Sequence, residues 1–86
     1  MGLSIKEKEK REKERWLKDF GQHLKKIRQE KGISGGELGR LLFMDQPNIS
    51  RLENGKVNPS LYLIKQISDA LEMSIQEFLE DFTIKG

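Results

Sequence analysis

Short runs of apolar residues, spaced three and four apart and separated by helix-ending signals, most strongly limit how this chain can fold. This spacing places side chains on one face of an α-helix, whereas a strand requires strict alternation. The runs are Leu17, Phe20, Leu24 and Ile27; Leu38 and Leu42; Ile49 and Leu52; Leu61, Ile64, Ile67 and Leu71; and Ile75, Phe78 and Leu79. Five helices with short connections predict a compact all-α domain.

Local signals mark where these helices begin and end. Gly32 follows the first run and suits the left-handed position that ends a helix. Two pairs have capping-box spacing, Ser34 with Glu37 and Ser74 with Glu77. Asp45 can cap a helix whose first turn contains Pro47, and Asn54-Gly55 ends that helix. The sequence therefore predicts a short helix over about 46–53.

Charge divides the chain into unlike parts. Residues 1–15 carry a net charge of +2, residues 16–56 carry +3 and residues 57–86 carry −3. Residues 6–15 contain no apolar side chain, so we expect 1–15 to form a charged, partly helical or mobile arm. Residues 16–82 form the expected domain and 83–86 a C-terminal tail. A basic face suits a polyanionic partner, although ordinary solvated charge explains these values equally well.

Several functional classes lack support in the composition. The 86 residues contain no cysteine and one histidine, so neither a cysteine nucleophile nor a metal site is expected. His23 lies among polar neighbours, where we expect it to face solvent or phosphate. The longest apolar run, 41–44, is far too short for a membrane span, and no secretory pattern is visible. We expect a cytoplasmic protein that is not an enzyme and has no cofactor.

The helix predicted over 46–53 has an unusual outward face. The residues around buried Ile49 and Leu52 are amides, a proline, a hydroxyl and a guanidinium, where a helix built only for packing usually has Ala, Glu or Lys. Gly39, in the preceding helix, allows two helices to cross steeply at close range. This combination predicts a helix-turn-helix whose second helix enters a DNA major groove.

The sequence resembles the phage repressor and Cro-type helix-turn-helix proteins, also called the XRE family, over about residues 18–82. The resemblance is carried by "LKKIRQEKGIS", "ELGRLL", "QPNISRLENGKVNPS" and "IKQISDALEMSIQEFL". It implies a five-helix, lambda-repressor-like DNA-binding domain, usually dimeric, that binds double-stranded operator DNA. We therefore expect a nucleoid-associated transcriptional regulator that acts as a repressor.

The resemblance also implies roles for individual residues. The residues expected to read bases are Gln46, Pro47, Asn48, Ser50 and Arg51, with Asn48 near the edge of the groove. Asn54 and Lys56 are expected beside the DNA backbone. Arg28 and Glu53 occupy positions that often form an ion pair between the first helix and the end of the recognition helix.

Four residues depart from the family pattern. Gly35 replaces a glutamine that often contacts phosphate, and Phe43 replaces the usual glycine of the turn. Leu41 and Phe43 are expected to form an additional apolar patch, and the charge of Asp45 repels phosphate. A protein-interaction module or an antitoxin-type partner with the same fold is therefore the alternative. Activator and restriction-modification controller roles also remain open at this stage.

The C-terminal apolar residues predict how the protein assembles. Phe78, Phe82 and Ile84 exceed what a short fifth helix needs for packing. A recognition helix of two turns covers only a few base pairs, so useful affinity requires two copies. We therefore expect a homodimer formed through the fifth helix and the tail.

Overall fold

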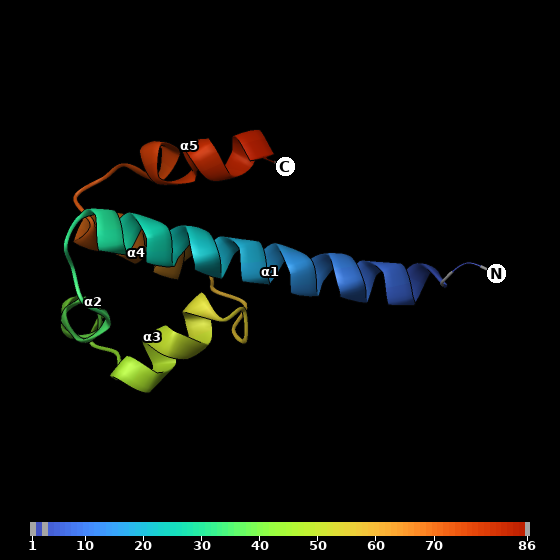
Figure 1. Cartoon of the computed structure of the whole chain (residues 1–86), viewed down its shortest axis with the longest axis horizontal. Helices are drawn as coiled ribbons and strands as arrows, with labels where there is room; N and C mark the ends of the chain where they lie inside the picture. Colours follow the sequence, from blue (N-terminus) through green and yellow to red (C-terminus); the bar gives the residue numbers. More distant parts are fainter. Residues whose placement is uncertain (1, 3, 86) are drawn as a thin grey trace.

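The chain folds into five helices in the computed structural model, which describes residues 2 and 4–85. Only the backbone is described for 81 and for 83–85. The helices are α1 (Ile5–Glu30), α2 (Gly35–Leu42), α3 (Gln46–Glu53), α4 (Leu61–Ala70) and α5 (Ile75–Lys85). The described residues contain no strand. Figure 1 shows α2 and α3 along one side of α1 and α5 along the other side.

A single apolar core joins the five helices. It consists of the buried side chains of Phe20, Leu24, Ile27, Leu38, Leu42, Ile49, Leu52, Ile67, Leu71 and Phe78. All of these side chains belong to the predicted apolar runs, although Leu17, Leu61 and Ile75 of those runs lie outside the cluster. Leu61 was expected on the buried face of α4, but it is 74% exposed, and Leu63 packs against the core instead. Ser60 caps α4 by accepting a hydrogen bond from the Leu63 amide, so Leu61 lies in the first turn, away from the other helices.

Helix α1 is longer than the run of apolar residues predicted. Residues 5–15 are continuous with the rest of α1, and Ser4 caps the helix by accepting a bond from the Glu7 amide. Figure 1 shows this N-terminal part of α1 extending beyond the other helices. Its side chains are exposed, so it adds no buried surface to the core. Acid-to-base pairs four residues apart, such as Glu7 with Arg11, favour helix in such a segment.

Two glycines let helices approach at backbone distance. A Cβ atom added to Gly21 of α1 would lie 2.2 Å from the carbonyl oxygen of Glu53 at the end of α3. A Cβ atom on Gly39 of α2 would lie 2.5 Å from the carbonyl oxygen of Met44. A close approach at Gly39 was predicted between the two helix backbones, but the backbone that it meets belongs to Met44 of the turn, and α3 contributes only the Ile49 side chain at 3.6 Å. The contact at Gly21 was not predicted, although a glycine inside a helical run is a recognised signal of close packing.

The contact between α1 and α5 corrects two expectations. His23 is buried rather than facing solvent or phosphate, and its Nε2 atom hydrogen-bonds the carbonyl oxygen of Phe78. Phe78 is fully buried, and the half-buried Phe82 packs edge-on against Trp16 with ring centroids 5.0 Å apart. These two phenylalanines are therefore used by the domain itself, contrary to the expectation that they exceed its needs. The side chain of Ile84 lies outside the described residues.

Candidate nucleic-acid interface

Helices α2 and α3 are joined by a turn of three residues. The capping box at the start of α2 is present: Ser34 accepts from the Glu37 amide at 3.0 Å, and Glu37 accepts from the Ser34 amide at 3.3 Å. Phe43 ends α2 in the left-handed conformation with φ of 55°, and the Met44 amide donates to the Gly39 carbonyl at 2.8 Å. A non-glycine residue in this conformation is strained, as expected for Phe43 if its φ is positive.

Helix α3 is divided into a buried face and an exposed face. Ile49 and Leu52 are each 1% exposed and belong to the core. All five predicted base-reading residues are exposed; they are Gln46, Pro47, Asn48, Ser50 and Arg51. Pro47 lies in the first turn, where its missing amide hydrogen has no intrahelical partner to lose. The structure therefore brings the predicted polar face together on one side of α3.

Asp45 differs from its expected role. It occupies the N-cap position of α3 with extended backbone angles, but its side chain makes no capping hydrogen bond. The turn is closed by backbone bonds instead, in which the amides of Asn48 and Ile49 donate to the Asp45 carbonyl oxygen. The exposed carboxylate therefore remains beside the first turn of α3. There its negative charge interacts favourably with the positive end of the helix dipole but repels an approaching phosphate.

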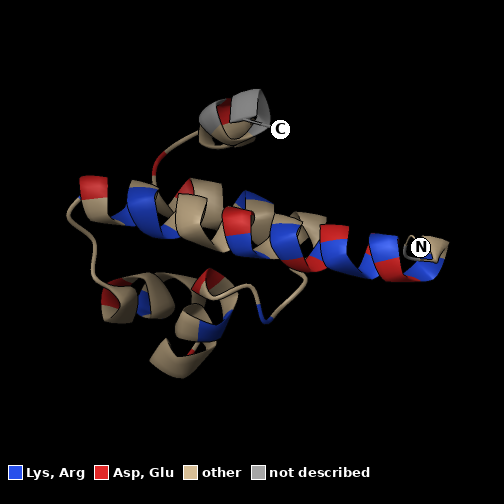
Figure 2. Ribbon diagram, turned by 45° about the vertical axis from the view of Figure 1, so that its right-hand side comes forward, with Lys and Arg blue, Asp and Glu red and all other residues tan. Residues whose placement is uncertain are grey.

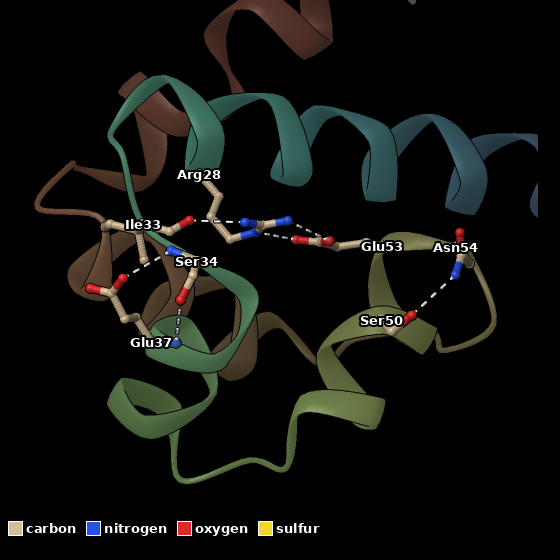
Figure 3. A network of polar contacts seen from close by, with 7 residues as sticks. All are labelled: Arg28, Ile33, Ser34, Glu37, Ser50, Glu53 and Asn54. Atoms are coloured by element: carbon tan, nitrogen blue, oxygen red, sulfur yellow. Dashed lines mark hydrogen bonds and ion pairs between the residues drawn. The ribbon is translucent and has the colours of Figure 1, made fainter.

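A largely buried ion pair between Arg28 and Glu53 connects the end of α3 to α1. The Arg28 Nε atom donates to Glu53 Oε2 at 2.7 Å, and Nη2 donates to Oε1 at 3.1 Å. The remaining Nη1 atom donates to the Ile33 carbonyl oxygen at 2.9 Å (Figure 3). Donation to the Glu53 carboxylate raises the pKa of Arg28, while burial acts in the opposite direction. These contacts hold α1, the α1–α2 connection and α3 in a fixed relation.

The residues beyond the end of α3 are also exposed. Asn54 is the C-cap of α3, and its Nδ2 atom donates to Ser50 Oγ at 3.4 Å (Figure 3). Lys56 follows Gly55, whose φ of 74° turns the chain away from the helix. A Cβ atom on Gly55 would lie 2.8 Å from the Lys18 amide nitrogen, so this turn rests directly on α1. Asn54 and Lys56 therefore lie beside the exposed face of α3 on a supported turn.

Charge is unevenly distributed over these elements. Figure 2 shows basic and acidic residues alternating along the N-terminal part of α1, whereas most of α3 is uncharged. Arg51 is the basic residue of α3 and Glu53, already paired with Arg28, is its acidic residue. The exposed face of α3 can therefore form hydrogen bonds through amide, hydroxyl and guanidinium groups while carrying one positive charge. Among the described residues, no three His, Cys, Asp or Glu side chains are grouped to hold a metal ion.

A family model described as helix-turn-helix matches residues 24–78, a range that includes α2, the turn and α3. The chain belongs to the helix-turn-helix family. The helix-turn-helix motif of this chain consists of α2, residues 43–45 and α3. As a family member with the five-helix, lambda-repressor-like fold, it is a DNA-binding transcriptional regulator and not an enzyme.

Other helix-turn-helix proteins resemble this one over most of its length. The control protein C.MunI of a Mycoplasma species is 36% identical over 63 residues, which cover 72% of this chain and 85% of C.MunI. The helix-turn-helix-type transcriptional regulator SinR of Bacillus subtilis is 32% identical over 63 residues, covering 72% of this chain and 57% of SinR. The structure of the restriction-modification controller protein C.AhdI of Aeromonas hydrophila matches with a TM-score of 0.68 and 34% identity, covering 72% of this chain and 94% of C.AhdI.

None of the described helices in this helix-turn-helix protein combines the length and the hydropathy that a membrane span requires.

Proposed function

We propose that this regulator is a repressor that binds a specific operator as a homodimer, with α3 in the major groove. The observation that carries the proposal is the division of α3: Ile49 and Leu52 are buried, while Gln46, Asn48 and Arg51 are exposed. A helix with one buried and one exposed face can pack against the protein core and contact a base-pair edge at the same time. Repression requires only that the protein occupies DNA overlapping a promoter, whereas activation requires a further contact.

The chemistry of the exposed face suits base recognition. Arg51 can donate two hydrogen bonds to a guanine edge, and the amide of Gln46 can donate to and accept from adenine. Ser50 can bond either kind of base pair, with Asn48 at the edge of the groove, and the ring carbons of Pro47 can contact a thymine methyl group. Asn54 and Lys56 lie past the end of α3, where contacts with phosphate fix register without reading sequence.

The experiment that tests this proposal is selection of bound duplexes from a random DNA pool, followed by titration of single-base variants of the selected site. Arg51→Ala should weaken binding to the selected site by about 1–3 kcal/mol and relax the choice at one base position. Lys56→Ala is the matched control, since it also removes one exposed positive charge. It should weaken binding to all sequences alike and reduce the salt slope by about one unit. If Arg51→Ala instead weakens binding equally for every variant, Arg51 does not read a base.

A partly exposed apolar surface on α5 supports the proposed homodimer. Helix α5 packs Phe78 into the core but leaves Ile75, Leu79 and Phe82 half-buried, and Trp16, which packs against Phe82, is 50% exposed. A second copy would cover this surface and place two recognition helices about 34 Å apart, one turn of DNA. Sedimentation at tens of micromolar tests assembly. A monomer both with and without duplex would contradict the dimer but not base reading by one α3.

A second candidate function is favoured by one observation. Phe43 is 97% exposed and Leu41 is 54% exposed, and both belong to the helix-turn-helix motif rather than to α5. Exposed apolar side chains next to each other suit a protein partner, as in an interaction module or an antitoxin. Salt-dependent binding to generic duplex separates the two functions, because counterion release accompanies DNA binding and not an apolar protein contact.

A further inference from the structure

The glycines between residues 21 and 55 fall into two groups according to whether the fold requires them. Gly21 and Gly39 are required because an added Cβ atom would come within 2.2 Å and 2.5 Å of carbonyl oxygens. Gly32 and Gly55 are required by their positive φ of 71° and 74°. Gly35 and Gly36, which open α2, meet neither condition. Their φ is not positive, and an added Cβ atom would make only ordinary contacts with its neighbours.

These two glycines destabilise α2. Helix α2 has only eight residues, and glycine is less favourable than alanine in a helix by up to about 1 kcal/mol per residue. A serine cap and a reciprocal glutamate bond compensate at the same turn. When a residue weakens local structure without a packing or backbone reason, the reason is more often found at a functional site.

The side chain that lies over both glycines is Gln46. A Cβ atom on Gly35 would lie 3.8 Å from Gln46 Nε2, and one on Gly36 would lie 3.6 Å from Gln46 Oε1. The two glycines thus lie under opposite ends of the same amide group. Because neither has a side chain, they present only backbone atoms to that side of the amide.

We propose that Gly35 and Gly36 determine base specificity by leaving the Gln46 amide unrestrained at the start of the recognition helix. The inference rests on the proposed reading of a base pair by Gln46. An unrestrained amide can turn either its donor or its acceptor toward the groove, so it adapts to the base pair it meets. A methyl group at position 35 or 36 would make van der Waals contact with one end of the amide and would block positions of the amide closer to α2. The smaller range of amide positions changes the preference among base pairs.

The test is a double-mutant cycle read out on DNA sequence preference. Gly35→Ala and Gly36→Ala are made in the full chain and in a Gln46→Ala background, and dissociation constants are measured for all four base pairs at each position of the selected site. Each alanine should change the ratio between base pairs at the Gln46 position by about two- to tenfold, the coupling typical of residues in contact. In the Gln46→Ala background the same substitutions should change no ratio. Urea melts should show unchanged or higher stability, since alanine favours the helix.

Each other result overturns the inference in a distinguishable way. If both glycine variants weaken binding to every sequence equally, and still do so without Gln46, the glycines serve close approach of the DNA backbone instead. If they alter neither affinity nor preference, they have no role in recognition. If Gln46→Ala alone leaves all base preferences unchanged, Gln46 reads no base, and the proposed assignment fails together with the inference.

Discussion

Removal of the Glu53 carboxylate provides a direct test of how α1 holds the recognition helix. The side chains of Arg28 and Glu53 are only 11% and 8% exposed, and they share two hydrogen bonds. In Glu53→Ala, the guanidinium keeps its bond to the Ile33 carbonyl but loses its compensating charge. Breaking a buried pair from one side costs about 3–5 kcal/mol. Because both side chains retain some access to water, we expect a loss near the lower limit.

The assay is urea unfolding followed by far-ultraviolet circular dichroism at neutral pH. Glu30→Ala is the matched control, since it removes a glutamate from the exposed face of the same region and should change stability by less than about 0.5 kcal/mol. A loss of 3 kcal/mol corresponds to a fall in the melting temperature of about 12–24 °C for a domain of this size. Replacing both partners, as in Arg28→Met with Glu53→Leu, should recover part of the loss because no unpaired charge remains.

Equal and small losses in Glu53→Ala and Glu30→Ala would refute this reasoning, because they would mean that the ion pair contributes no more than an exposed carboxylate. Failure of the double replacement to recover any stability would show that the loss comes from packing at Glu53 rather than from the uncompensated guanidinium.

Three further perturbations follow from the backbone and the caps. Phe43→Gly should raise the free energy of unfolding in urea by about 0.5–1 kcal/mol, because glycine adopts the left-handed conformation without strain and the exposed ring loses no packing; an unchanged or lower value would contradict this. Gly39→Ala should lower the free energy of unfolding by about 1–3 kcal/mol, because the new methyl group collides with the Met44 carbonyl oxygen. An unchanged free energy of unfolding would show that the backbone of the turn can move to accommodate the methyl group. Bonds from Ser74 lower the pKa of Glu77 below its ordinary value of 4.5, so its stabilisation of α5 is present above that pH and is lost as the pH falls through the lowered pKa. Acid titration of unfolding should show this loss in the native chain and not in Glu77→Gln.

The features that the sequence predicted well depend on residues within one or two turns of each other. Both capping boxes are formed, at Ser34 and at Ser74, because each requires only a hydroxyl and a carboxylate three residues apart. The ends of α1 and α3 at Gly32 and Gly55 are set by residues that accept positive φ without strain. The exposed face of α3 follows from helical periodicity once Ile49 and Leu52 are assigned to the core.

The features that the sequence did not predict depend on contacts between distant segments. His23 has polar neighbours in sequence, but α5 returns across α1 and supplies the Phe78 carbonyl that it bonds, 55 residues away. The contact between α1 and α5 also uses Phe78 and Phe82, whose rings pack against Phe20. From the sequence, these two residues were expected to exceed what a short fifth helix needs for packing. Asp45 has the right residue type for a cap, yet its side chain makes no capping bond, because residue type does not fix the rotamer.

The sequence by itself therefore determined the five helices, most of their ends, the turn between α2 and α3 and the polar character of the outward face of α3, but not the N-terminal extent of α1. These follow from local spacing and local hydrogen bonding, which act within a few residues. Only the tertiary structure decided that Gly21 contacts Glu53, that Arg28 also donates to the Ile33 carbonyl oxygen, and that the Gln46 amide lies over two glycines of α2. Such contacts depend on the angle at which helices cross, and that angle is set by the packing of the whole core rather than by any one segment.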